Sequence, residues 1–179
     1  ILQNSIPKRT NIPIVLRVSS GNSILNEDLS NEELCVSIED AIRLNASAVA
    51  FSIYIGGAYE HQTIVEFSKL VNDAHRYGLP VLAVTAVGKD MNRDLRYLSL
   101  ASRIAVELGA DIVKTYYCDG FNELIAACPV PVVIAGGKKV PELDALEFAH
   151  KAISDGAAGV DMGRNIFQSE SPENMIQAV

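Results

Sequence analysis

Six short apolar segments alternate with amphipathic segments along the chain, and this alternation limits the possible folds more than any other feature. Each apolar segment is hydrophobic at both odd and even positions, as strands covered on both faces are. A strict alternation of strand and helix predicts parallel strands joined by right-handed crossovers. The predicted strands are Ile14–Val18, Ala48–Tyr54, Pro80–Thr85, Asp111–Tyr116, Pro131–Ala135 and Ala158–Met162.

Helix signals lie between the predicted strands. The sequence Ser30-Asn31-Glu32-Glu33 is typical of a capping box, and it predicts a helix with an apolar face of Leu34, Ile38, Ala41 and Ile42. Two later helices are expected to end at Gly78 and Gly109, because glycine is common just after a helix. Two more are expected to begin at Pro141 and Pro172, because proline suits the first turn.

Two architectures fit this pattern: an open doubly wound sheet and a (β/α)₈ barrel. No GxGxxG follows the first strand, so the dinucleotide-binding form of the open sheet loses its main support. A barrel takes about 250 residues, whereas this chain has 179 and starts abruptly, without an initiator methionine. We therefore predict an α/β fold of the TIM-barrel type whose first two strands are missing from this sequence. Residues 1–179 would form a single barrel domain that contains strands three to eight.

Composition excludes several classes of partner. The net charge is −7 and the basic residues are scattered singly or in adjacent pairs, without a longer cluster, which argues against nucleic acid and against an acidic membrane surface. No segment approaches the roughly 20 apolar residues that a membrane span requires. The three cysteines lack CxxC spacing and predict reduced thiols in a cytoplasmic protein. The three histidines lie far apart and show no metal-ligand spacing, so we expect no metal.

Lys114 lies at the end of a predicted strand, where an ammonium group is costly to bury. Such a lysine can be paired with a carboxylate, and Asp111 and Asp119 are the nearby candidates. Alternatively, burial lowers the pKa of a lysine, and a neutral amine condenses with ketones. Lys114 is therefore a candidate Schiff-base former. Lys89 and Lys138 are rival amines in loops, where we expect poorer nucleophilicity.

Two glycine turns follow the last two predicted strands. Gly136-Gly137 follows the seventh strand of the predicted barrel, and Gly163-Arg164 follows the eighth. Barrels often bind phosphate through the backbone N–H groups of these two loops. Glycine lets the backbone approach an anion closely, and Arg164 can bind it through its guanidinium. The alternative is that Gly136-Gly137 is only a tight turn and Arg164 only a solvated charge.

Three segments resemble the DeoC/FbaB class I aldolase family: Lys114–Tyr117, Val133–Lys139 and Gly159–Gln168. The similarity covers essentially the whole chain. It implies a TIM barrel with a Schiff-base lysine at Lys114 and phosphate loops at Gly136-Gly137 and Gly163-Arg164. It also implies a homo-oligomer.

The resemblance further implies an activity. A phosphorylated dione derived from autoinducer-2, a quorum-sensing signal, would transfer its acetyl group to coenzyme A, giving dihydroxyacetone phosphate and acetyl-CoA. Coenzyme A would be a co-substrate, with no permanently bound cofactor. Archaeal-type members carry an acid/base tyrosine after strand five, where this chain has Thr85-Ala86-Val87-Gly88. This departure favours acyl transfer over aldol cleavage.

Two other functions remain open. One is a class I aldolase of the fructose-bisphosphate or deoxyribose-phosphate type, and the other is a non-catalytic barrel that binds phosphate. The resemblance also implies an acid/base histidine near the family's first two strands, which are missing here. Tyr54 and Tyr116 are possible hydroxyl donors at strand ends, although buried packing is the favoured role for each.

Overall fold

The computed structural model describes residues 11–23, 25, 28–87 and 91–179. Its main sheet has six parallel strands in the order β1-β4-β5-β6-β7-β8, which is also their order along the chain. A doubly wound sheet reverses its strand order at a switch point, so the open-sheet alternative is wrong and the barrel type is supported. All six predicted strands are confirmed: β1 (Val15–Arg17), β4 (Ala48–Ile55), β5 (Val81–Val87), β6 (Ile112–Thr115), β7 (Val132–Ala135) and β8 (Gly159–Asp161).

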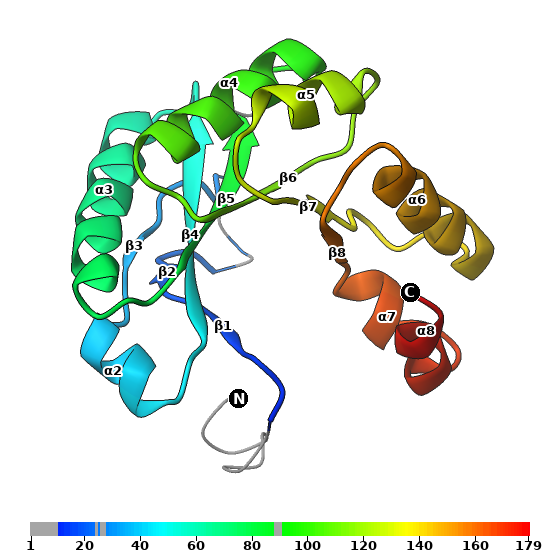
Figure 1. Ribbon diagram of the computed structural model, residues 1–179, viewed down its shortest axis with the longest axis horizontal. Helices are drawn as coiled ribbons and strands as arrows, with labels where there is room; N and C mark the ends of the chain where they lie inside the picture. The colour runs from blue at the N-terminus through cyan, green and yellow to red at the C-terminus, as the bar shows by residue number, and fades with distance from the viewer. Residues whose placement is uncertain (1–10, 24, 26–27, 88–90) are drawn as a thin grey trace.

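The helices lie along the outer side of an arc of strands, and β1 and β8 lie at its two ends (Figure 1). The sheet is therefore curved into part of a barrel. The helices are α2 (Ile38–Arg43), α3 (Glu60–Arg76), α4 (Leu95–Glu107), α5 (Phe121–Ala127), α6 (Glu142–Ser154), α7 (Arg164–Phe167) and α8 (Pro172–Ala178). Within the described residues, no helix has the length and apolar character needed to cross a membrane. The assignment of residues 1–179 to a single domain stays a prediction.

The capping box predicted at Ser30–Glu33 is wrong. Ser30 Oγ donates to Asp28 instead of capping a helix, and Glu33–Leu34 forms the short strand β3, antiparallel to β2 (Ser19–Ser20). The helix begins later, at Ile38, where Ser37 Oγ accepts a hydrogen bond from the backbone N–H of Asp40. Two of the four residues predicted for its buried face are exposed, Leu34 and Ile42. The other predicted helix ends, at Gly78, Gly109, Pro141 and Pro172, lie within two residues of the observed ones.

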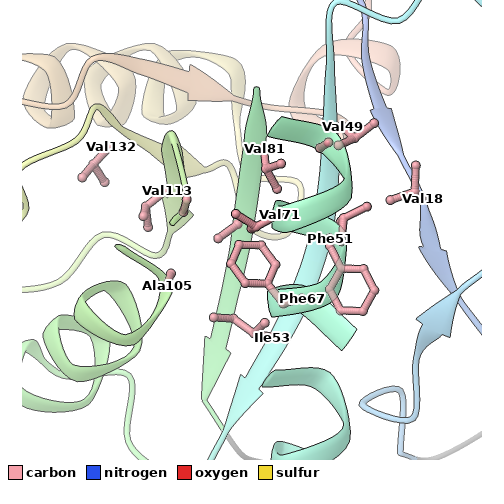
Figure 2. Close-up of a cluster of buried hydrophobic side chains, with 14 of the residues drawn as sticks. Val18, Val49, Phe51, Ile53, Phe67, Val71, Val81, Ala105, Val113 and Val132 are labelled. Atoms are coloured by element: carbon pink, nitrogen blue, oxygen red, sulfur yellow. The ribbon is translucent and has the colours of Figure 1, made fainter. Parts of the chain in front are cut away.

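The core lies between the outer face of the sheet and the helices. Phe51 and Ile53 of β4 are fully buried and lie close to Phe67 of α3 (Figure 2). The rings of Phe51 and Phe67 have centroids 6.2 Å apart and are tilted by 52°, a favourable arrangement for an aromatic pair. Because side chains alternate along a strand, Ser52 and Tyr54 of β4 must lie on the other, inner face. The packing of the core thereby determines which residues lie inside the arc.

Candidate active site

The parallel register aligns inner-face residues across the middle of the sheet. Ser52 of β4 lies opposite Val84 of β5, Val84 lies opposite Lys114 of β6, and Lys114 lies opposite Val133 of β7. The next inward residues toward the carboxyl ends include Tyr54 and Asp161. All of these residues except Val133 line a pocket of about 370 Å³ inside the arc. Residues far apart in sequence are therefore brought together by strand pairing alone.

All five predicted site residues line this pocket. Lys114 comes from β6, Gly136-Gly137 follow β7, and Gly163-Arg164 follow β8. They lie at the carboxyl ends of the parallel strands, where barrel enzymes place their active sites. The rival amine Lys138 is exposed and outside this pocket, whereas Lys89 lies outside the described residues.

Lys114 is paired with Asp161, a residue that sequence reasoning missed. The Nζ atom lies 2.7 Å from Asp161 Oδ2, and the lysine side chain is only 21% exposed. The predicted pairing with Asp111 is wrong, because Asp111 accepts a hydrogen bond from the backbone N–H of Val81 and pairs with His75. Asp161 directly precedes Met162 and the second glycine turn, and this position was the available signal.

Gly136 allows the ends of β7 and β8 to approach each other closely. A Cβ atom at this position would lie 2.9 Å from Met162 Cα, a contact that side-chain carbons do not make. Gly137 has φ +68°, a backbone conformation that favours glycine. Both glycines lie on the pocket wall beside Gly163 and Arg164, and the alternative of only a tight turn is not tested by this geometry.

Asn165 supports the loop after β7, and sequence reasoning missed this role. Its side chain is buried, with 3% exposure. The Nδ2 atom donates to Gly136 O at 2.7 Å and to Lys138 O at 3.3 Å, while Oδ1 accepts from Val140 N at 2.9 Å. One amide therefore satisfies three backbone groups and fixes the first glycine turn relative to the second.

A second polar group of residues lies on the other side of Lys114, on β1, β2, β4 and the loop before β3. Arg17 Nη2 donates to Glu32 Oε1 at 2.5 Å and to Ser52 Oγ at 2.6 Å. Ser19 Oγ and Tyr54 OH also donate to the Glu32 carboxylate, at 2.6 and 3.0 Å. Arg17, Ser52 and Tyr54 line the pocket, whereas Glu32 is buried behind them. We refer to these five residues as the Arg17 network.

The protonation states of the network follow from its contacts. Burial alone would raise the pKa of Glu32, but hydrogen bonds from Arg17 and Ser19 and the attraction of the guanidinium lower the pKa below its ordinary value. Burial and the charge of Glu32 raise the pKa of Tyr54 to about 12. At neutral pH, Glu32 is therefore a carboxylate and Tyr54 a phenol. The packing role favoured for Tyr54 is incomplete, because its hydroxyl group belongs to this network.

Tyr116 also lines the pocket, and the guanidinium of Arg93 lies 4.0 Å from the centre of its ring. This distance is typical of a cation–π interaction. Among the residues that the structure describes, no group of three or more histidine, cysteine, aspartate or glutamate side chains could hold a metal ion.

An amine and two glycine turns at the carboxyl ends of a curved parallel sheet are the arrangement expected of aldolase-type barrels. Comparison with known sequences gives the family. The profile of DeoC/LacD family aldolases matches residues 2–169. The chain belongs to this family.

Relatives with high sequence identity have a specific name. The chain is 61% identical to proteins of Photorhabdus laumondii and Klebsiella pneumoniae, both named 3-hydroxy-5-phosphonooxypentane-2,4-dione thiolase. Each match covers 100% of this chain, which spans 62% of the first relative and 61% of the second.

Solved structures of archaeal fructose-1,6-bisphosphate aldolases have the same fold. The match to one of them has a TM-score of 0.90 and 30% identity, and it covers 99% of this chain and 73% of the aldolase chain. The match to another has a TM-score of 0.88 and 28% identity, and it covers 99% of this chain and 72% of the aldolase chain. In the second protein, the catalytic lysine is covalently bound to the carbinolamine intermediate of the substrate.

We expect Asn165→Ala to destabilise the protein by about 1–3 kcal/mol, because buried backbone groups lose their hydrogen-bond partners. Asn165→Asp keeps the acceptor for Val140 N but places a buried carboxylate oxygen against Gly136 O and Lys138 O, so its loss of stability should be at least as large as that of Asn165→Ala. Urea unfolding measures both free energies. Asn122→Ala, at an exposed position of α5, is the control and should change stability by less than about 0.5 kcal/mol. Equal losses of stability for Asn165→Ala and Asn122→Ala would contradict the role of Asn165 in supporting the loop after β7.

The lowered pKa of Glu32 predicts a pH dependence of stability. Because the pKa is lower in the folded than in the unfolded protein, ionised Glu32 stabilises the fold fully above its unfolded pKa of about 4.3. This contribution is lost as the pH falls through the folded pKa. We expect Glu32→Gln to show a flatter decline in the free energy of unfolding on acidification than the wild type. Urea unfolding at several pH values measures this, and the exposed Glu147→Gln should keep the wild-type slope.

Proposed function

We propose that the protein containing this chain is a Schiff-base thiolase. It would cleave 3-hydroxy-5-phosphonooxypentane-2,4-dione with coenzyme A to give dihydroxyacetone phosphate and acetyl-CoA. The main supporting observation is that the amine of Lys114 shares one pocket with both glycine turns. The names of relatives with 61% identity support the choice of substrate.

The phosphate group of the substrate is bound at the ends of β7 and β8. Backbone N–H groups of Gly137 and Gly163 approach it closely, and Arg164 supplies the positive charge. The N–H of Gly136 donates to Asp161 O, so Gly136 contributes the close approach of the backbone and not a donor. Asn165 keeps the first turn in place. Binding energy from this non-reacting end holds the ketone next to Lys114, which reduces the entropic part of the barrier.

Asp161 accepts the proton that Lys114 must lose. An ammonium group has no lone pair, so the amine attacks only after transferring a proton, and Asp161 Oδ2 lies 2.7 Å away. The amine then adds to the ketone next to the phosphate-bearing carbon. Loss of water from the adduct gives an iminium ion, which withdraws electrons from the adjacent carbon.

Carbon–carbon cleavage then transfers the acetyl group. The thiol of coenzyme A adds to the second ketone, and the bond between the acetyl carbon and the hydroxyl-bearing carbon breaks. The electron pair of this bond moves toward the iminium ion and leaves an enamine, while acetyl-CoA departs. The enamine gains the proton that the thiol lost. Hydrolysis of the imine releases dihydroxyacetone phosphate and regenerates the lysine.

A sugar-phosphate aldolase is the second candidate, supported by the fold shared with archaeal fructose-1,6-bisphosphate aldolases. The end of β5 counts against it, because Thr85 and Ala86 line the pocket there and neither carries an acidic phenol. A non-catalytic barrel that binds phosphate is the third candidate, and its pocket would bind phosphate without forming an imine.

We expect borohydride reduction in the presence of dihydroxyacetone phosphate to attach the triose to Lys114, as located by peptide mass mapping. Lys114→Ala should abolish the adduct and the turnover without unfolding the protein, whereas Lys138→Ala should retain both. An adduct on Lys138 alone would reject the assignment. Acetyl-CoA formation that requires both the dione and coenzyme A separates the thiolase from the aldolase. Phosphate binding without any adduct would favour the non-catalytic barrel.

Asp161→Asn should slow imine formation by about 10²–10⁴-fold, the usual contribution of a positioned base. Part of the rate should return at high pH, where hydroxide replaces the missing acceptor. The rate of borohydride trapping at several pH values measures this. Asp119→Asn is the matched control in the loop after β6, and it should trap at the wild-type rate. Equal rates for Asp161→Asn and the wild type at all pH values would remove Asp161 from the mechanism.

The proposal also includes a cytoplasmic location and a homo-oligomeric assembly. A coenzyme A-dependent enzyme with the free cysteines Cys35, Cys118 and Cys128 suits the reducing cytoplasm. The processing of a quorum-sensing signal would take place there. Membership of the family supports a homo-oligomer, and light scattering on the intact protein tests this.

A further inference from the structure

The Arg17 network has no role in the steps described so far, although three of its members line the reaction pocket. Lys114 lies in the middle of the sheet, with the glycine turns toward β8 and the Arg17 network toward β1. Between the lysine and the network, β5 contributes Val84, Thr85 and Ala86, none of which is charged. The pocket therefore has two polar sides, one on each side of the amine.

A substrate anchored by its phosphate must extend toward the network. The phosphate occupies the glycine turns, and the ketone captured by Lys114 lies one carbon further along the substrate. The remaining carbons of the dione carry a hydroxyl group and the acetyl carbonyl. With the turns toward β8 and the amine on β6, these groups extend toward β4 and β1. A phosphorylated triose lacks this acyl end and does not extend so far.

The chemistry of the network suits such an acyl end. Glu32 is 7% exposed and accepts hydrogen bonds from Arg17, Ser19 and Tyr54, so it holds the guanidinium in a fixed position. The Arg17 side chain is nevertheless 52% exposed, and it faces the pocket. The Tyr54 hydroxyl donates to Glu32, which leaves its oxygen able to accept a hydrogen bond.

We infer that Arg17 binds the acetyl carbonyl of the dione and stabilises the negative charge on its oxygen while the thiol adds. Tyr54 accepts a hydrogen bond from the neighbouring hydroxyl group of the substrate. Arg17 is then a catalytic residue for the thiolysis step and has no part in imine formation. This inference rests on the proposed function, because only a substrate with an acyl end reaches Arg17.

The test compares two reactions of the same intact protein. Borohydride trapping of dihydroxyacetone phosphate uses Lys114 and the phosphate turns, whereas thiolysis of the dione also uses the acyl end. We expect Arg17→Met to lower kcat for thiolysis by about 10²–10³-fold, the usual cost of losing an oxyanion donor. The trapping rate should equal that of the wild type. Tyr54→Phe should show a smaller loss, again confined to thiolysis.

Two controls separate this role from a structural one. Arg43→Met removes an exposed arginine of α2 that is paired with Asp40, and it should leave both reactions unchanged. Arg17→Lys keeps a positive charge and should retain part of the thiolysis rate. If Arg17→Met and Arg17→Lys lower trapping and thiolysis in parallel, Arg17 is structural and the inference is wrong. The inference is also wrong if thiolysis by Arg17→Met is undiminished.

The wild type separates failure of the inference from failure of the proposed function. A wild-type protein that traps the triose but forms no acetyl-CoA from the dione contradicts the thiolase itself, whatever the variants do. A wild type that performs both reactions, together with an Arg17→Met variant that performs both equally well, contradicts only the role of Arg17.

Discussion

The alternation of side chains along parallel strands is the constraint on which the rest of the structure depends. Phe51 and Ile53 are buried against α3, and this packing obliges Ser52 and Tyr54 to lie inside the arc. A shift of one residue in the register of β4 would exchange the two sets. It would bury polar groups in the core and leave the pocket without them. The burial of apolar residues in the core therefore also specifies which side chains line the pocket.

Close backbone contact at the ends of β7 and β8 is the second requirement. Gly136 permits it, because any side chain there would meet Met162. Asn165 then holds the loop through three hydrogen bonds to backbone groups. These buried bonds are costly to lose, and they keep the N–H groups of the turn in place before a ligand arrives. Such preorganisation is what makes a backbone site effective for an anion.

Local patterns were enough to predict the strands and five of the residues that line the pocket. The six strands could be predicted because their apolar residues occur at both parities. Lys114 was identifiable because a charge at the end of such a strand is unusual. Asp161 was not assigned, because its pairing with Lys114 depends on how β6 and β8 are brought together. Glu32 was placed in a helix cap, because the local sequence around it resembles a capping box. Its actual partners, Arg17 and Ser19, are distant in sequence, so no local pattern indicates them.

The distribution of charge in the pocket explains which way a phosphorylated substrate would lie. The positive charge of Arg17 is balanced by the carboxylate of Glu32, and that of Lys114 is balanced by the carboxylate of Asp161. Among the lining residues that the structure describes, Arg164 therefore supplies the excess positive charge, and it lies beside the glycine turns. The chain as a whole carries a net charge of −7, so attraction of a phosphate has to be local. A dianionic phosphate is consequently favoured at the ends of β7 and β8 over the Arg17 network, although both sides contain a guanidinium. The buried carboxylate of Glu32 thus does more than position Arg17. By balancing the guanidinium charge, it would lower the affinity of that side for phosphate and leave it to the uncharged end of the proposed substrate.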